Sequence, residues 1–174
     1  EADRITHRYP EGVAVVPTGI DATRFPFTER PEQFRVLFSG HNWFRKGFVY
    51  LFMAAKFLEK EHPGSSFEYD FNIGRSEGPP VRLPPLTSSH GFTNYPDGLF
   101  SPYPPYVNIY AKTSVAVLPT LEDALPLSID EAMASGIPVI TTPHAGSRIV
   151  DGKSGFIVPI RDYEAIAAKL LYFY

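Results

Sequence analysis

Residues 115–140, with the sequence VAVLPTLEDALPLSIDEAMASGIPVI, decide the fold of this chain. The apolar run 115–118 predicts a buried strand that a proline ends. Residues 126–135 predict a helix, with a proline in its first turn and Gly136 just past its end. Residues 138–140 predict a second buried strand. An apolar strand, a helix and another apolar strand in succession are typical of a parallel β-α-β unit.

The same alternation continues on both sides of this unit. Apolar rather than alternating strands indicate a sheet that is covered on both faces. We therefore expect an α/β fold, a Rossmann-like parallel sheet with helices on both faces. The other expected strands are residues 13–16, 35–38, 67–73, 88–92 and 155–158, and the other expected helices are residues 47–62, 106–111 and 162–174.

Length and composition limit the classes of protein that the chain can belong to. A chain of 174 residues with 44% hydrophobic residues suits one domain with a sizeable core. The 16 basic and 19 acidic residues give a net charge of −3, which argues against nucleic acid as a partner. The sequence has no cysteine, and no apolar run reaches the ~18 residues that a membrane span needs. No spacing of His, Asp or Glu suggests a metal site.

Two segments lie outside the alternation of strands and helices. Residues 1–12 form a polar lead-in segment, and residues 76–105 hold many of the 18 prolines. Because strands flank residues 76–105, we expect a long Pro-rich loop within one domain rather than a linker. The chain begins with Glu1 and shows no signal peptide, so we expect a mature product or, in preference, an excised segment of a longer protein.

Ligands of open α/β sheets bind at the carboxyl ends of the strands. Three segments are expected at that edge: the loop with His41, Arg45 and Lys46, a turn at Gly91-Phe92, and the loop 120–125 before the helix. A helix N-terminus offers free backbone N–H groups to an anion, and the basic side chains add positive charge. Together these groups predict a pocket for a diphosphate.

Two acidic residues of the central stretch are candidates for binding a sugar. Asp123 lies in the loop before the helix, and Glu131 lies more than a turn into it. Each carboxylate can accept hydrogen bonds from a pair of hydroxyls, but the two are placed too differently for a glycosidase pair. For Asp123 a second interpretation stays open, since an acidic side chain near a helix N-terminus also stabilises the helix.

Four motifs in this order resemble the C-terminal domain of retaining GT-B glycosyltransferases, family GT4 or glycosyl transferases group 1. Val15-Val16-Pro17-Thr18-Gly19-Ile20-Asp21, followed by Phe25, is similar to the segment that leads into that domain. Residues 39–47 are similar to its G-R…K-G segment. Residues 118–140 resemble its L-P-S…E-x7-E-A-M-A-x-G-x-P-V-I signature, and residues 151–159 its D-G-x-x-G-x-L-V-P segment. The resemblance implies that the chain is one half of a GT-B fold.

The resemblance also implies a role for individual residues. Lys46 would bind the donor diphosphate, Glu131 the ribose hydroxyls, and Asp123, which stands where the family has Glu, the transferred sugar. These three are the expected catalytic residues. His41 replaces the family's Arg, and Ala124 to Ser128 would offer backbone N–H groups to the phosphates. The expected donor-binding residues are Gly40, His41, Arg45, Gly91, Phe92, Ala124, Leu125, Pro126, Leu127 and Ser128.

The function implied by the resemblance is glycosyl transfer with retention from a UDP-, GDP- or ADP-linked sugar. The acceptor would be a polysaccharide, a lipid or a small molecule, bound by an N-terminal domain that these 174 residues lack. The isolated domain is therefore expected to be inactive. The resemblance also implies that the reaction needs no metal or other cofactor, and that the protein is cytoplasmic or peripheral to a membrane through the missing domain.

The alternative is a non-catalytic α/β nucleotide-binding or interaction module. The glycine motif G-x-G-x-x-G of dinucleotide domains and the P-loop are both absent.

Overall fold

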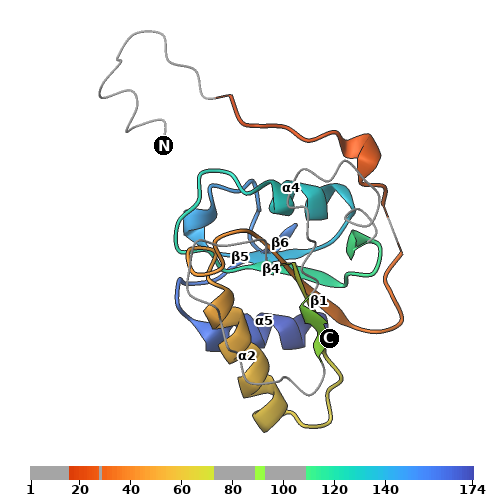
Figure 1. Cartoon of the computed structure of the whole chain (residues 1–174), viewed down its shortest axis with the longest axis vertical. Coiled ribbons are helices and arrows are strands. Elements are labelled where there is room, and N and C mark those ends of the chain that lie inside the picture. The colour runs from red at the N-terminus through yellow and green to blue at the C-terminus, as the bar shows by residue number, and fades with distance from the viewer. Residues whose placement is uncertain (1–15, 28, 73–88, 93–108) are drawn as a thin grey trace.

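The computed structural model describes residues 16–27, 29–72, 89–92 and 109–174 of the chain (Figure 1). Its centre is a six-stranded sheet in the order β3-β2-β1-β4-β5-β6, and each neighbouring pair is parallel. This is the strand order of a doubly wound Rossmann sheet. The strands are β1 (Arg35–Ser39), β2 (Glu68–Asn72), β3 (Ser89–Phe92), β4 (Val115–Leu118), β5 (Val139–Thr141) and β6 (Gly155–Ile157).

Helices cover both faces of the sheet, as the sequence predicted. Helices α2 (Phe48–Glu61) and α5 (Tyr163–Phe173) pack against each other on one face, and α4 (Leu127–Ala134) covers the opposite face (Figure 1). Two short 3-10 helices, η1 (Ala22–Arg24) and η3 (Pro143–Ala145), lie in the connections. The α/β fold class is confirmed, and the parallel sheet places all strand carboxyl ends at one edge.

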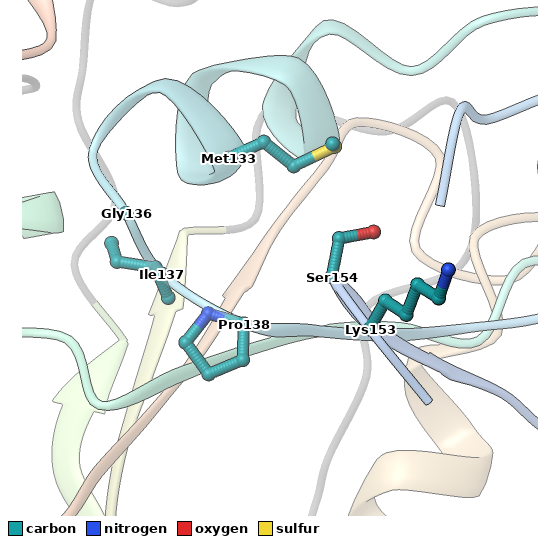
Figure 2. Close-up of a pocket in the computed structure, with 6 residues that line it drawn as sticks. All are labelled: Met133, Gly136, Ile137, Pro138, Lys153 and Ser154. Atoms are coloured by element: carbon teal, nitrogen blue, oxygen red, sulfur yellow. The ribbon is translucent and has the colours of Figure 1, made fainter. Parts of the chain in front are cut away.

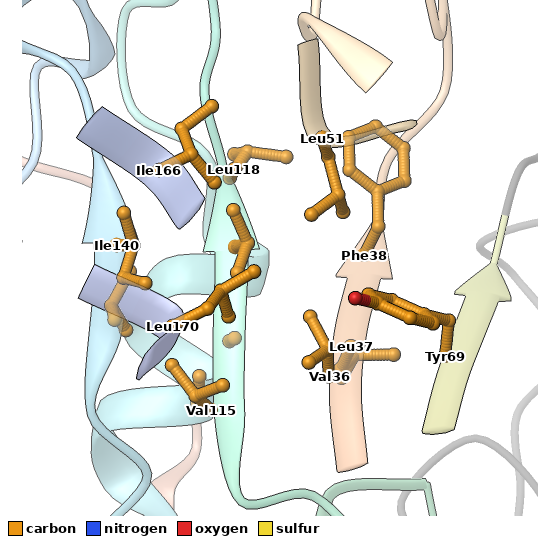
Figure 3. Close-up of a cluster of buried hydrophobic side chains, with 14 of the residues drawn as sticks. Val36, Leu37, Phe38, Leu51, Tyr69, Val115, Leu118, Ile140, Ile166 and Leu170 are labelled. Carbon is orange, nitrogen blue, oxygen red and sulfur yellow. The ribbon is translucent and has the colours of Figure 1, made fainter. Parts of the chain in front are cut away.

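The central strands are apolar throughout because both of their faces are buried. Figure 3 shows side chains of β1, β4 and β5 packed with side chains from α2 and α5. All of the labelled aliphatic residues are 3% exposed or less, and burying each stabilises the fold by roughly 1.5–3 kcal/mol. They are Val36, Leu37, Leu51, Val115, Leu118, Ile140, Ile166 and Leu170.

Tyr69 of β2 is an exception within this apolar core. Its side chain is 1% exposed, and it stacks between Phe67 and Phe71 in a row of aromatic rings. Within the described part of the chain, the Tyr69 hydroxyl has no hydrogen-bond partner. Burial raises the pKa of Tyr69 above its ordinary value because the ionised phenolate would lose its hydration.

Several sequence predictions differ from the structure in their bounds. Helix α4 begins at Leu127, and Pro126 is its N-cap rather than part of its first turn. Strand β5 begins one residue later than expected, at Val139. Of the expected strand 13–16, only Val16 is described, and it is 85% exposed. The lead-in segment 1–12, most of the loop 76–105 and residues 106–108 of the expected helix 106–111 lie outside the described residues.

The sequence contains no apolar run long enough to span a membrane, and the helices of the structure bear on the same point. Among the helices of the described ranges, none combines the length and the apolar character that crossing a bilayer requires.

Candidate functional site

The loops that follow β1 and β4 lie side by side, since the two strands are neighbours in the sheet. The backbone N–H of Leu121 donates to the carbonyl oxygen of Arg45 at 2.9 Å, and the Thr120 hydroxyl donates to the same oxygen at 3.0 Å. In the other direction, Arg45 Nη1 donates to the carbonyl oxygen of Glu122 at 2.8 Å. The basic loop and the acidic loop therefore form one hydrogen-bonded unit at the carboxyl edge.

An ion pair joins the two candidate residues of this unit. Lys46 Nζ contacts Asp123 Oδ2, and the two side chains are 12% and 10% exposed. Arg45 Nη1 lies 3.7 Å from Asp123 Oδ1, on a side chain that is 43% exposed. Asp123 is thus the counter-ion of two basic residues at once. The pair cannot be predicted from the sequence, because Lys46 and Asp123 are 77 residues apart and no local pattern joins them.

Two glycines allow Lys46 to take this position. Gly47 has a φ of +74°, and a Cβ there would overlap the carbonyl oxygen of Pro119. A Cβ on Gly40 would lie 3.2 Å from Cγ of Lys46, closer than a comfortable contact. The lysine stem therefore lies over a bare backbone at Gly40, and the close approach at Gly47 fixes the loop against the end of β4.

The other side of the acidic loop rests on the segment that follows β5. The backbone N–H of Asp123 donates to the carbonyl oxygen of His144 at 2.9 Å, and the His144 ring Nδ1 lies 3.0 Å from the carbonyl oxygen of Leu121. Gly146, with a φ of +60°, lies so close that a Cβ would overlap the carbonyl oxygen of Ala124. The loop carrying Asp123 is consequently held from both sides.

The N-terminus of α4 offers fewer backbone donors than the sequence analysis expected. Pro126 has no N–H, and the N–H of Ala124 donates to Asp123 Oδ1 at 3.0 Å. The expectation that every residue of 124–128 presents an N–H group is therefore wrong at Pro126. The remaining donors of the segment are the N–H groups of Leu125, Leu127 and Ser128, and those of the first helical turn have no intrahelical partner.

Glu131 is buried rather than exposed on its helix. It is 7% exposed, and its Oε2 accepts a hydrogen bond of 2.7 Å from the hydroxyl of Tyr110. Tyr110 lies just before β4 and is 1% exposed. Sequence reasoning missed Tyr110, because a tyrosine in an apolar stretch gives no sign that its hydroxyl meets a carboxylate 21 residues away.

Among the other predicted site residues, His41 lies in the same loop as Lys46, whereas Gly91 and Phe92 lie on a strand at the edge of the sheet. His41 is half-buried in the loop after β1. Gly91 and Phe92 were expected both at the end of the strand 88–92 and in a turn. The strand is confirmed and the turn is wrong, because both residues lie within β3, which pairs with β2. Since β3 is at the sheet edge, β2 and β1 separate it from β4.

A pocket of about 230 Å³ lies elsewhere on the domain (Figure 2). It is formed between the C-terminal end of α4 and the residues that precede β5 and β6, so it lies at the amino ends of the strands. Its lining residues are Met133, Gly136, Ile137, Pro138, Lys153 and Ser154, and none of them is a predicted site residue. No group of three potential metal-ligating residues occurs in the described portions of the chain.

Comparisons with known proteins assign the chain to a family and support its fold. Residues 33–174 match the family model of glycosyl transferases group 1. The chain is 25% identical over 183 aligned residues to the glycogen synthase of Mycobacterium tuberculosis, an alignment that covers 97% of this chain and 42% of that enzyme. This chain therefore spans less than half the length of that relative.

Two solved structures share the fold. The C-terminal domain of a group 1 glycosyl transferase from Francisella tularensis superposes with a TM-score of 0.67 at 19% identity, over 88% of this chain and 87% of that domain. The pneumococcal O-GlcNAc transferase, solved in complex with UDP and GlcNAc, gives a TM-score of 0.57 at 18% identity, over 85% of this chain and 31% of that chain. At these identities the likeness shows the fold alone. The family model spans most of the sequence, and the chain belongs to the glycosyl transferases group 1 family.

Proposed function

We propose that this chain is the nucleotide-sugar-binding domain of a retaining GT-B glycosyltransferase of the hexosyltransferase type. The observation that carries the proposal is the convergence of Lys46, Arg45 and Asp123 at the carboxyl edge, beside the N-terminus of α4. Ligands of doubly wound sheets bind at this edge. The likeness to a C-terminal domain solved by itself supports the domain assignment.

Lys46 is the proposed ligand of the donor diphosphate. A lysine ammonium group has three N–H donors, so it can keep its contact with Asp123 while it binds phosphate oxygens. Arg45 and the N–H groups of Leu127 and Ser128 add positive potential. When the glycosyl group departs, negative charge accumulates on the diphosphate, and these fixed groups stabilise it.

The two carboxylates bind the hydroxyl groups of the donor in this proposal. Glu131 holds the ribose, and Asp123, which Lys46 and Arg45 orient, accepts hydrogen bonds from the transferred sugar. The UDP and GlcNAc bound to the pneumococcal enzyme support a nucleotide-linked sugar as the class of ligand.

The acceptor, whether a polysaccharide, a lipid or a small molecule, binds to an N-terminal domain in this proposal. The chain spans 42% of a relative's length, which leaves room in such proteins for a second domain. We propose that the isolated 174 residues transfer no sugar, that the reaction needs no metal or other cofactor, and that the enzyme works in the cytoplasm or at a membrane surface. Transfer by the isolated chain would contradict the first of these.

Calorimetric titration of the chain with UDP-glucose, GDP-mannose and ADP-glucose tests the proposal. We expect saturable binding of at least one donor, and a loss of tenfold or more in affinity for Lys46→Gln and for Glu131→Ala, about 1.4 kcal/mol each. Lys153→Gln is the matched control, since Lys153 lies at the opposite edge of the sheet. If the folded wild-type chain binds none of the three donors, the proposal is wrong.

A further inference from the structure

A buried hydrogen bond fixes the carboxylate that the proposed function assigns to the ribose. The Tyr110 hydroxyl donates to Glu131 Oε2 at 2.7 Å, and the two residues are 1% and 7% exposed. A hydrogen bond to an ionised group is shorter and stronger than one between neutral groups. Because the pair is enclosed, water is a poor substitute for the hydroxyl if it is removed.

The ring of Tyr110 is itself held in place by the N-terminal part of the described chain. Phe25, which is 6% exposed, packs edge-on against it with ring centroids 5.7 Å apart and an interplanar angle of 83°. Phe25 follows η1, whose N-cap Asp21 accepts a hydrogen bond of 3.1 Å from the N–H of Thr23. A continuous series of contacts therefore links the 3-10 turn through Phe25 and Tyr110 to Glu131.

We propose that Tyr110 is a positioning residue for nucleotide recognition, and that through Glu131 it sets the preference of the site for ribose over sugars without the 2′ and 3′ hydroxyls. The inference rests on the proposed role of Glu131. A glutamate has three rotatable side-chain bonds, and its carboxylate must be fixed before it can accept from two hydroxyls of one sugar ring. The tyrosine hydroxyl occupies one acceptor position on Oε2 and so restrains the rotation of the carboxylate.

The experiment measures binding of UDP, GDP and ADP, and of the 2′,3′-dideoxy form of each, to the 174-residue chain by calorimetry. For the diphosphate that the wild type binds most tightly, we expect Tyr110→Phe to weaken binding of the ribose form about tenfold and of the dideoxy form less than twofold. Glu131→Ala should do the same, and Tyr110→Phe in the Glu131→Ala background should add no further loss.

Tyr69→Phe is the matched control because Tyr69 is as deeply buried as Tyr110, while its hydroxyl has no hydrogen-bond partner in the described part of the chain. We expect it to bind all the diphosphates like the wild type. An equal loss for the ribose and dideoxy forms in Tyr110→Phe would show a general structural effect and overturn the inference.

The outcomes for the two residues separate this inference from the proposed function. If Glu131→Ala abolishes the ribose preference and Tyr110→Phe keeps it, only the role of Tyr110 is wrong. If Glu131→Ala keeps the ribose preference, or the wild-type chain binds no diphosphate, the proposed role of Glu131 is wrong and the inference is overturned with it.

Discussion

Lys46 and Asp123 form an ion pair between the loops that follow the adjacent strands β1 and β4. Both side chains are nearly buried, with 12% and 10% exposed, so neither charge is well hydrated when the other is removed. The ion pair holds the two loops together, and it brings a basic and an acidic group to one point at the carboxyl edge of the sheet.

The first prediction concerns the stability that depends on this pair. Lys46→Met should lower the free energy of unfolding by roughly 1–3 kcal/mol, because Arg45, at 3.7 Å, is then the one basic side chain that the described residues leave near Asp123. Lys46→Met with Asp123→Leu should recover most of the loss, since no buried charge remains. Urea denaturation at pH 7 measures both.

The control is Lys56→Met. The side chains of Lys56 and its partner Glu59 are 37% and 23% exposed, so loss of this ion pair should cost under about 1 kcal/mol. A double variant no more stable than Lys46→Met would contradict the argument.

The second prediction concerns Tyr69 at alkaline pH. Its ordinary pKa is 10.0, and burial raises the pKa in the folded protein. Above about pH 10 the unfolded chain loses this proton while the folded chain keeps it, so the free energy of unfolding falls as the pH rises. Tyr69→Phe should make this decline shallower by up to about 1.4 kcal/mol per pH unit between pH 10 and 12. Denaturation at several pH values measures it, and equal slopes for the two proteins would show that the premise is wrong.

The third prediction concerns Gly47. Gly47→Ala should destabilise the domain by at least about 2 kcal/mol, because the residue has a φ of +74° and its Cβ would meet a backbone carbonyl that cannot move aside easily. Gly64→Ala is the control, since a Cβ there meets nothing within 4 Å. Thermal melting compares the two variants. The same melting temperature for both would exclude a tight contact at Gly47.

The fourth prediction concerns the start of α5. Asp162 Oδ1 accepts a hydrogen bond of 2.8 Å from the N–H of Ala165, which makes Asp162 the N-cap of that helix. Asp162→Ala should cost about 1 kcal/mol, and Asp162→Asn should keep most of the stability because its amide oxygen can accept the same bond. Chemical denaturation distinguishes them. An Asn variant as unstable as the Ala variant would assign the effect to charge instead of capping.

The order of elements could be predicted from the sequence because it depends on local patterns. The expected strand 35–38 corresponds to β1, and the expected helix 47–62 corresponds to α2. Phe48, Leu51 and Leu58 of α2 are buried at helical spacing. Asp162 likewise marked the start of α5. Strands without polar alternation indicated a sheet covered on both faces, and the structure confirms it.

Some boundaries could not be predicted, since tertiary contacts set them. The strand 88–92 was expected, but Gly91 and Phe92 also suggested a turn. Only the pairing with β2, in which Phe71 lies opposite Phe92, shows that both residues belong to the strand. Pro126 belongs to the cap rather than the first turn because it has an extended ψ of 111°. A local pattern does not specify either of these conformations.

By itself, the sequence determined the fold class, the family resemblance and the choice of Lys46, Asp123 and Glu131 as candidates, because motif spacing and apolar periodicity are properties of neighbouring residues. Only the tertiary structure decided which groups meet. The contact of Lys46 with Asp123 spans 77 residues, and that of Tyr110 with Glu131 spans 21. Both depend on how the parallel strands are ordered and how α4 packs on them. Long-range contacts of this kind depend on the burial of the whole core, and they cannot be predicted from any single segment of the sequence.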